Sequence, residues 1–569
     1  MRLGMGMLLT CVGVAGACGA ADEGGGGPGT GGRNTGPGGS GAGESGATGS
    51  GVGGSAGSSG AGAHDAGGVD SGEAGDSGSG GNEHTGGSAA GSSAGSGLGG
   101  SAGANHSGGH GASDPGEAGN AGVGGSAGAA GNQVGGAGGE AGSAGAGGSS
   151  DTGPSGPATI QKLVSNEDVT CVLMSDGHVK CWGRSRSLGY GNSETIGDDE
   201  LPASVGYLSV TATPGEGVAQ LWPGDHSCAL LTNRSLTCWG NGLNGQLGYA
   251  SGNGLIVGDD ELPSSMGPVS VTNTPGVYVT QIAINGGHTI ALLSDGSVKS
   301  WGSNWNGELG VGGNIRGIGA WERPSDVAAV SVTNAAGVRT IQVVTGFFHT
   351  CALLADRTVK CWGSGTLGYA TSYPNLSIGD DEVPSSVGPV SVTTKSGVTV
   401  QKLFAGDFIT CALLSDNSLK CWGSNSVGSI GLPGVSGVGG NPPPSSFEPI
   451  SVTTDSSLEI VDVGAGHGHV CVLLSNGTVK CWGENNLGQL GRGNTVNIGD
   501  DEAPSSIGPV SITTKPGVVA TQLAVGGYHT CVLLSDQTVK CWGRSYSYGD
   551  TNDIGDDELP SSVGAVSVF

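Results

Sequence analysis

A unit of about sixty residues recurs seven times along this 569-residue chain, and every copy ends in the dipeptide Trp-Gly. The tryptophans follow one another at intervals of 57, 62, 61, 60, 60 and 60 residues, at Trp182, Trp239, Trp301, Trp362, Trp422, Trp482 and Trp542. A fixed period of this kind is typical of solenoids, propellers and arrays, because one unit cannot bury its apolar face without its neighbours. Seven similar units make a scaffold, so a specific function must depend on the places where the copies differ.

Within the best-formed copy, the pattern predicts four short antiparallel strands. Alternating segments rich in β-branched residues are separated by turn residues, and they span residues 509–513, 518–525, 529–534 and 538–543. No segment shows helical periodicity over three turns. Seven four-stranded sheets predict a β-propeller, in which the sheets pack face to face around an axis.

The two ends of the repeat region suggest how such a ring closes. The first copy starts at residue 158 with its second strand, whereas residues 564–569 form a first strand with nothing after it. A terminal strand that completes the first blade would remove two open sheet edges together. We therefore expect residues 158–569 to form an all-β, seven-bladed propeller of four-stranded blades, closed by the C-terminal strand.

Twelve of the fourteen cysteines form six pairs, each ten residues apart: Cys171 with Cys181, Cys228 with Cys238, Cys351 with Cys361, Cys411 with Cys421, Cys471 with Cys481, and Cys531 with Cys541. If the turn between the two strands is type I with a bulge, Met174 faces His178 and Cys171 lies opposite Cys181, near disulfide distance. The third copy has Ile290 and Ser300 at these positions, so both cysteines are absent together. The spacing does not suit zinc knuckles. We therefore expect six disulfides and an oxidising compartment.

The first 18 residues are typical of an export signal. A positive charge at Arg2 and an apolar run too short to span a bilayer precede small residues and Cys18. Residues 15–18 resemble a bacterial lipobox, whose cysteine is acylated after cleavage, and Cys11 is a second candidate. The alternative is a plain secretory signal cleaved near Ala21. We expect an exported protein, either a lipoprotein of the outer membrane or cell surface, attached to membrane only through Cys18, or a secreted protein.

Residues 19–157 contain no Trp, Tyr, Phe, Ile or Lys. Such a segment cannot bury enough apolar surface to offset its ordering entropy, so we expect a disordered linker between the signal and the propeller. The formal net charge is −27, of which about −10 falls on residues 1–157. Nucleic-acid binding requires clusters of Lys and Arg, which the sequence lacks, so nucleic acid is not an expected partner.

The segments that follow the Trp-Gly dipeptides carry a recognisable motif. Residues 482–491 are Trp-Gly-Glu-Asn-Asn-Leu-Gly-Gln-Leu-Gly, and residues 239–248 are Trp-Gly-Asn-Gly-Leu-Asn-Gly-Gln-Leu-Gly. This pattern resembles the regulator of chromosome condensation repeat family, and the resemblance covers residues 158–569. It implies a seven-bladed propeller whose terminal strand closes the ring. The family includes nucleotide-exchange factors for a nuclear GTPase, a plant ultraviolet photoreceptor and secreted inhibitors of β-lactamase, so function must be argued from sites.

Side chains that recur in most copies are expected to be structural. The Trp-Gly tryptophans should pack one blade on the next. Five histidines precede the first cysteine position by two residues, and each should hydrogen-bond to the backbone of its own blade rather than join a metal-binding ring: His226, His288, His349, His469 and His529.

Five copies carry an acidic loop of the form Gly-Asp-Asp-Glu-x-Pro. Clustered carboxylates suit hard cations such as calcium, but the loop lacks the alternating ligand spacing of a calcium hand. We therefore prefer the interpretation that Asp caps backbone N–H groups in a turn, and we expect no metal or other cofactor. Ten aspartates are kept as weak metal candidates: Asp198, Asp199, Asp259, Asp260, Asp380, Asp381, Asp500, Asp501, Asp556 and Asp557.

The loop at residues 304–327 departs most from the repeat, and it contains Trp305, Arg316, Trp321 and Arg323. Exposed aromatic and arginine side chains suit a protein contact, with tolerated drift in a surface loop as the alternative. No nucleophile elbow, phosphate loop or His-Glu-x-x-His motif is present, so no enzyme is expected. We expect a monomeric, membrane-tethered scaffold outside the cytoplasm that binds a protein or a glycan. The alternatives are an inhibitor of an envelope enzyme and, by family analogy, a nucleotide-exchange role.

Overall fold

The computed structural model describes residues 158–569, apart from residue 187 and residues 371–376. The predicted signal at residues 1–18, with Cys18, and the predicted linker at residues 19–157 lie outside the described residues and stay predictions. The described part folds into seven antiparallel sheets of three or four strands, numbered here as blades 1–7 in chain order. The prediction of an all-β, seven-bladed propeller is confirmed.

Each blade is built from strands that follow one another in the chain. Four blades have three strands: β1 (Ile160–Asn166), β2 (Val169–Met174) and β3 (Val179–Gly183) in blade 1; β12 (Thr340–Thr345), β13 (His349–Leu354) and β14 (Val359–Gly363) in blade 4; β19 (Ile460–Ala465), β20 (His469–Leu474) and β21 (Val479–Gly483) in blade 6; β22 (Ala520–Val525), β23 (His529–Leu534) and β24 (Val539–Gly543) in blade 7.

Three blades have a fourth strand: β4 (Val218–Trp222), β5 (His226–Leu231), β6 (Leu236–Gly242) and β7 (Leu255–Val257) in blade 2; β8 (Val279–Asn285), β9 (His288–Leu293), β10 (Val298–Ser303) and β11 (Gly317–Ile318) in blade 3; β15 (Val400–Ala405), β16 (Ile409–Leu414), β17 (Leu419–Ser424) and β18 (Gly437–Val438) in blade 5. The loops contain six 3-10 turns: η1 (Pro202–Ser204), η2 (Pro263–Ser265), η3 (Pro324–Asp326), η4 (Pro384–Ser386), η5 (Pro444–Ser446) and η6 (Pro504–Ser506).

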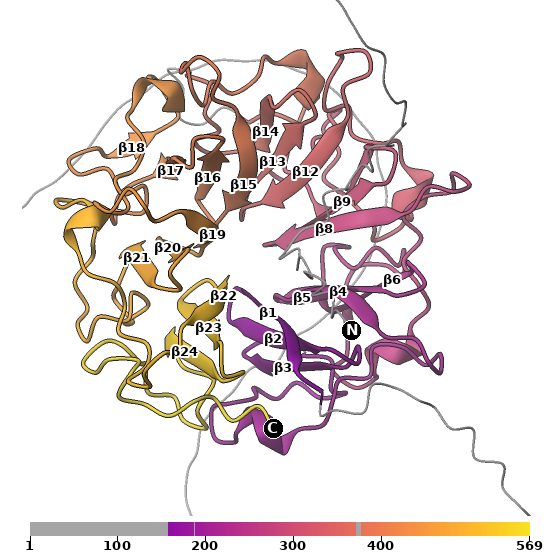
Figure 1. Ribbon diagram of the computed structural model, residues 1–569. Helices are drawn as coiled ribbons and strands as arrows, with labels where there is room; N and C mark the ends of the chain where they lie inside the picture. Colours follow the sequence, from indigo (N-terminus) through magenta and orange to yellow (C-terminus); the bar gives the residue numbers. More distant parts are fainter. Residues whose placement is uncertain (1–157, 187, 371–376) are drawn as a thin grey trace, which may run out of the picture. The chain divides into compact units, whose positions relative to one another are not determined.

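The first strands β1, β15, β19 and β22 lie nearest the axis, and the later strands of their blades lie farther out (Figure 1). First strands of neighbouring blades contact each other around the ring, and β22 of blade 7 contacts β1 of blade 1. The turn between the second and third strands has the predicted geometry: Met174 N donates to His178 O over 2.8 Å, and Gly177 has a φ of 84°. This turn sets the register of the hairpin.

The outer edge of the blades differs from the prediction of a leading Val-Ser-Val strand. That segment follows the Trp-Gly strand of its own blade and donates to the start of that strand, as from Leu208 N to Val179 O over 2.8 Å in blade 1. The end of the Trp-Gly strand pairs instead with β7, β11 or β18, or through a single bridge such as Gly183–Ile196. A sixty-residue period fixes the length of the unit but not the residue at which it starts. The predicted boundary between blades therefore fell before the Val-Ser-Val segment, whereas the observed boundary falls after it.

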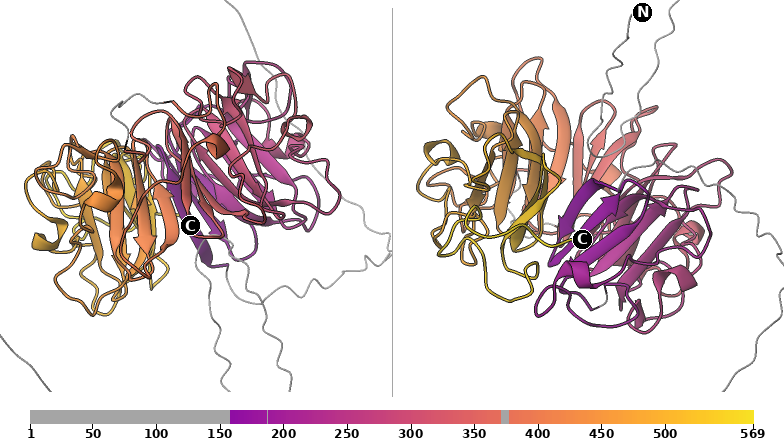
Figure 2. Two further views of the ribbon diagram at one scale, coloured as in Figure 1. Left: turned by 90° about the horizontal axis from the view of Figure 1, so that it is seen from above. Right: turned by 60° about the horizontal axis from the view of Figure 1, so that its bottom comes forward.

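The C-terminal segment accordingly lies on blade 7 and does not supply a missing strand to blade 1. Val566 forms a bridge with Val539 on β24, just as Leu208 contacts Val179. The segment still helps to join the two ends of the ring, because Lys180 Nζ of blade 1 donates to Val568 O over 3.0 Å. Figures 1 and 2 show the C terminus beside blade 1. Packing of β22 and β23 against β1 also contributes to the closure.

The six predicted cysteine pairs are joined as disulfides, each with a sequence separation of 10 and a Cα–Cα distance of 4.0–4.1 Å. The bonds join Cys171 to Cys181, Cys228 to Cys238, Cys351 to Cys361, Cys411 to Cys421, Cys471 to Cys481, and Cys531 to Cys541. The two cysteines of a pair lie directly opposite each other across the hairpin, as the turn geometry predicted. Ile290 and Ser300 occupy the same opposed positions in blade 3. Six disulfides indicate an oxidising environment.

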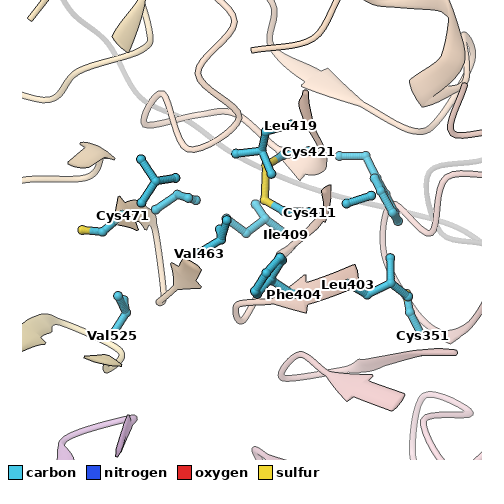
Figure 3. Close-up of a cluster of buried hydrophobic side chains, with 14 of the residues drawn as sticks. Cys351, Leu403, Phe404, Ile409, Cys411, Leu419, Cys421, Val463, Cys471 and Val525 are labelled. Carbon is cyan, nitrogen blue, oxygen red and sulfur yellow. A yellow bond between two sulfur atoms is a disulfide. The ribbon is translucent and has the colours of Figure 1, made fainter. Parts of the chain in front are cut away.

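The tryptophans pack one blade on the next, as predicted. All seven are buried, and Trp301 Nε1 donates to Gln246 O of the preceding blade over 2.8 Å. Because Trp182 of blade 1 bonds to Ser547 of blade 7 in the same sense, this contact also spans the closure of the ring. Between blades 5 and 6, apolar side chains such as Phe404 and Val463 fill the space beside the disulfide of Cys411 and Cys421 (Figure 3).

The prediction that each histidine bonds within its own blade was wrong. Each of the five imidazoles bonds through Nε2 to a threonine hydroxyl of the next blade: His226–Thr289, His288–Thr350, His349–Thr410, His469–Thr530 and His529–Thr170. The sequence contains a signal for this pairing. Blades 1 and 5 have Val169 and Ile409 in place of histidine, and the blades that follow them have Ser227 and Val470 in place of threonine.

Candidate functional site

The loop at residues 304–327 exposes two large aromatic rings on blade 3. The side chain of Trp305 is 64% exposed and that of Trp321 is 74% exposed. The Arg316 guanidinium lies over the Trp305 ring, 4.6 Å from its centroid, and Arg323 is exposed beside the buried Pro324. All four predicted partner-binding residues therefore lie at the surface, and we refer to them as the rim surface.

Hydrogen bonds from one buried asparagine hold Trp305 outward. Asn304 Oδ1 accepts from Leu309 N over 2.8 Å, and its Nδ2 donates to Ile315 O over 2.6 Å. Asn304 N donates to Arg316 O over 2.9 Å, which closes the loop and brings Arg316 to Trp305. Because the backbone of Trp305 is fixed by its neighbours, its ring is presented to solvent by the fold.

The second aromatic ring replaces an acid of the repeat. The segment from Gly319 to Pro324 stands where other blades have Gly-Asp-Asp-Glu-x-Pro, so Trp321 occupies the place of Asp260 in blade 2. Tryptophans as exposed as Trp305 and Trp321 are uncommon on a soluble protein, and Trp is enriched in the centres of protein interfaces. The copy that departs most from the consensus therefore exposes the side chains most suited to a protein contact.

The five acidic loops form separate clusters, one in each of five blades. In each cluster, one carboxylate oxygen from each acid lies within 4.8 Å of the others: Asp198–Glu200, Asp259–Glu261, Asp380–Glu382, Asp500–Glu502 and Asp556–Glu558. The first Asp caps the turn as expected, since Asp198 Oδ1 accepts from Asp199 N over 3.0 Å. Burial, and then hydrogen bonding to Asp381, raises the pKa of Glu382 to about 7. A hollow of about 680 Å³ adjoins the Asp198 cluster. The five clusters do not combine into one site.

A third surface, which the sequence analysis missed, lies where the loops between the first and second strands meet at the axis. Two side-chain hydrogen bonds connect blades that are not neighbours: Asn166 Nδ2 to Ile284 O over 3.1 Å, and Asn285 Nδ2 to Asp407 Oδ1 over 3.0 Å. Backbone bonds also join these loops in succession, from Phe347 N to Asp407 O, Asp407 N to Gly466 O, His467 N to Gly527 O, and Gly527 N to Glu167 O.

Aromatic side chains form an arc along blades 4 to 7 at this end of the propeller, which we call the axial arc. Its members are Phe347, Phe348, Phe408, His467 and Tyr528. Neighbouring ring centroids lie 4.6 Å apart for Phe347 and Phe348, 5.2 Å for Phe408 and His467, and 4.9 Å for His467 and Tyr528. Phe348 is 38% exposed and Phe408 42% exposed, so their rings are open to a partner.

Acidic side chains occupy the same loops. Glu167 Oε2 accepts from Asp225 N over 2.6 Å, and burial, followed by the nearby Asp225 charge, raises the pKa of Glu167 to about 8. Asp407 Oδ2 bonds His467 Nδ1 over 2.9 Å, which raises the pKa of His467. Arg544 Nη1 donates to Asp168 Oδ2 over 3.1 Å, and its guanidinium lies 4.4 Å from the Tyr528 ring centroid.

A signal for this surface was present in the sequence. The position directly before each histidine position is Asp168, Asp225, Gly287, Phe348, Phe408, Gly468 and Tyr528 in the seven copies. This position is acidic in two copies, aromatic in three and glycine in two, so it is a place where the copies differ. This position lies near the axis only because the strand before it is the innermost strand of its blade. The predicted unit boundary placed a different strand first, so the sequence did not indicate that these residues meet at the axis.

Strand register places Trp305 and the axial arc at the same end of the blades. His288 pairs with Gly302, so β9 begins where β10 ends, and the loop carrying Trp305 leaves blade 3 beside its axial loop. Ser303 N donates to Gly287 O over 2.8 Å at this point. Within residues 158–569, less the two short gaps, no helix is long and apolar enough to cross a membrane.

Comparison with known proteins identifies the repeats. Five segments match the Regulator of chromosome condensation (RCC1) repeat, at residues 279–308, 341–368, 400–429, 460–489 and 520–549, and a second model of the same repeat matches residues 476–533. The chain thus contains regulator of chromosome condensation repeats, as its Trp-Gly motifs indicated.

Similar proteins have diverse functions. The Probable E3 ubiquitin-protein ligase HERC6 of Homo sapiens is 30% identical over 338 residues, which cover 59% of this chain but only 29% of that protein. The Ultraviolet-B receptor UVR8 of Arabidopsis thaliana is 26% identical, with coverage of 70% of this chain and 80% of the receptor. The crystal structure of human WBSCR16 has a TM-score of 0.50 at 20% identity, covering 66% of this chain and 87% of that one, and supports the fold alone.

Proposed function

We propose that this propeller of regulator of chromosome condensation repeats is an exported, non-catalytic scaffold that captures a protein partner on its rim surface. Cys18 anchors the chain to a membrane, and residues 19–157 hold the propeller away from that membrane. The observation that carries the proposal is the exposure of Trp305 and Trp321 in the copy that departs most from the repeat. Burial of two such rings, with Arg316 and Arg323 beside them, would supply the energetic centre of an interface.

The compartment narrows the kind of partner. Six disulfides favour a site outside the cytoplasm, where the partner is an envelope or extracellular protein. A nucleotide-exchange role is less well supported, because the GTPases it would serve are not found there. The alternative function, inhibition of an envelope enzyme, would require the same kind of contact, because the propeller would bind that enzyme.

Variants that restore the repeat provide the test. Trp321→Asp recreates the acid found in blade 2, and Trp305→Leu recreates Leu243, its counterpart in that blade. Both changes are at exposed positions, so the fold should survive. The matched control is Leu243→Ala. Purified, oxidised full-length protein, wild type and variant, would be cross-linked to envelope extracts, and the captured proteins identified by mass spectrometry.

We expect one dominant partner, cross-linked near residues 304–327, that the double variant loses and the Leu243→Ala control retains. Capture that is equal for the double variant and wild type would refute the rim surface as the binding site. Mass spectrometry of the mature N terminus tests the anchor separately. A diacylated or triacylated Cys18 supports it, whereas an unmodified Ala or Gly excludes it.

A further inference from the structure

We propose that the axial arc is a second binding site, which accepts a cationic side chain, an arginine or lysine, from a peptide segment of a partner protein. The arc is defined by Phe347, Phe348, Phe408, His467 and Tyr528 at one end of the propeller axis. This site does not depend on the rim surface, and either can be correct without the other.

The rings supply the first part of the recognition. A cation placed over an aromatic face is attracted by the quadrupole of the ring, and the attraction grows when water is excluded. Phe347, Phe348 and Phe408 lie within 6.5 Å of one another, centroid to centroid, at interplanar angles of 80°, 31° and 48°. Rings so inclined to one another form the sides of a partial cage, rather than the flat platform that suits a stacked sugar or base.

Charge supplies the second part. The loops around the axis carry Glu167, Asp168, Asp225 and Asp407, and Glu484 follows the Trp-Gly strand of blade 6 at the same end. The cations facing them are Arg544 and His467, with the exposed Arg184 beside the Asp168 loop. Because the pKa of Glu167 is raised to about 8, its carboxyl is mostly neutral at pH 7. The other four carboxylates still outnumber the three cationic groups, which favours a cationic over an anionic ligand.

Arg544 shows, within the molecule, the contact that a ligand would make. Its guanidinium lies over the Tyr528 ring at 4.4 Å and donates to Asp168 Oδ2 over 3.1 Å. At the other end of the arc, no described lysine or arginine lies over Phe347, Phe348 or Phe408, and the His467 ring meets Phe408 edge to face with centroids 5.2 Å apart. Asp407 directly precedes Phe408 in the chain and bonds His467, so a second cation beside Phe408 would find both a ring and a carboxylate.

Calorimetric titration of the oxidised full-length protein with hexa-arginine and hexalysine tests this site, with hexaglutamate and a neutral glucose hexasaccharide as contrasting probes. Phe348→Leu with Phe408→Leu keeps the apolar surface but removes the ring faces. Phe408→Trp strengthens the π face. The matched controls are Trp321→Leu, for an exposed ring outside the axis, and Asp199→Asn with Asp260→Asn, for exposed acids on the outer loops.

We expect the basic peptides to bind, the double Phe→Leu variant to weaken binding about 3- to 30-fold, and Phe408→Trp to strengthen it. The controls should change affinity less than twofold. An equal loss in the outer-acid control would show non-specific attraction to a negative protein and overturn the proposal. Binding of the hexasaccharide or hexaglutamate, with no binding of the basic peptides, would also overturn it. If the Leu variants fail to fold, unchanged affinity in Phe408→Trp refutes the ring contact.

Discussion

The hydrogen bonds between histidine and threonine of adjacent blades can be tested by copying a pair that the protein already contains. Blades 4 and 5 are joined by His349 Nε2 and Thr410 Oγ1 at 2.8 Å, and both residues are buried. At the next junction the same positions are Ile409 and Val470, also buried. Replacing His349→Ile together with Thr410→Val therefore gives the junction of blades 4 and 5 the apolar pair that already joins blades 5 and 6.

The single variants should cost more than the double variant. A buried polar group that loses its partner costs about 1–3 kcal/mol, whereas replacement of both partners by apolar groups of similar shape is close to neutral. We therefore expect His349→Ile and Thr410→Val each to lower the free energy of unfolding by about 1–3 kcal/mol. The double variant should lie within about 1 kcal/mol of wild type, because neither partner is left unpaired.

The pH dependence gives an independent readout. Burial lowers the pKa of His349 to about 4 from an unfolded value of 6.5. Between pH 6.5 and pH 4, His349 is protonated in the unfolded chain but neutral in the folded chain. The stability associated with neutral His349 is therefore present above pH 6.5 and is lost as the pH falls toward 4. Between pH 7 and pH 5 this group alone should cost roughly 2 kcal/mol. Variants that lack His349 should lose that much less.

Urea denaturation of wild type, both single variants and the double variant, at pH 7 and pH 5, measures all of these quantities. A double variant as unstable as the sum of the two single variants would show that the pair is not coupled. Equal losses on acidification, with and without His349, would show that this imidazole is not held neutral by burial. Either result would refute the reasoning.

Three other predictions concern the disulfides, the acidic loops and the axis. The double substitution Cys351→Ile and Cys361→Ser copies the residues of blade 3. It should lower the free energy of unfolding, measured with urea, by about 2–3 kcal/mol, because a short loop is no longer closed in the unfolded chain. An unchanged midpoint would contradict this. Millimolar calcium should leave the thermal midpoint unchanged, and a rise that Glu382→Gln reduces would instead establish a metal site at that cluster. The pKa of Glu167 is raised to about 8, so this residue should contribute stability that is present below pH 4.5 and lost as the pH rises through 8. Glu167→Gln should therefore flatten the decline of the thermal midpoint between pH 5 and pH 8. An equally steep decline would refute this.

Much of the fold could be predicted because it depends on local pattern repeated many times. The period of the Trp-Gly strands indicated seven units, and alternation with turn residues indicated short antiparallel strands. The hairpin between the two cysteines is short enough that its turn determines its register, so the opposition of Cys171 and Cys181 followed from counting residues. The exposure of Trp305 and Trp321 followed from their departure from the repeat.

The hydrogen-bond partners between blades required the tertiary structure. The sequence places His529 and Thr170 359 residues apart, and only the closed ring brings them to 2.7 Å. The unit boundary was ambiguous for a related reason, since a cyclic pattern has no marked beginning, and the terminal segment was therefore assigned to blade 1 rather than blade 7.

The sequence by itself determined the number of blades, the three inner strands of each blade and the disulfides, because each of these depends on residues close together in the chain. Only the tertiary structure decided what gathers at the axis. Asn166 and Ile284 belong to blades that are not adjacent, yet they share a hydrogen bond because every blade directs its first loop to the same point. The axial arc and its carboxylates come from loops about sixty residues apart, and ring closure is the physical cause of their meeting.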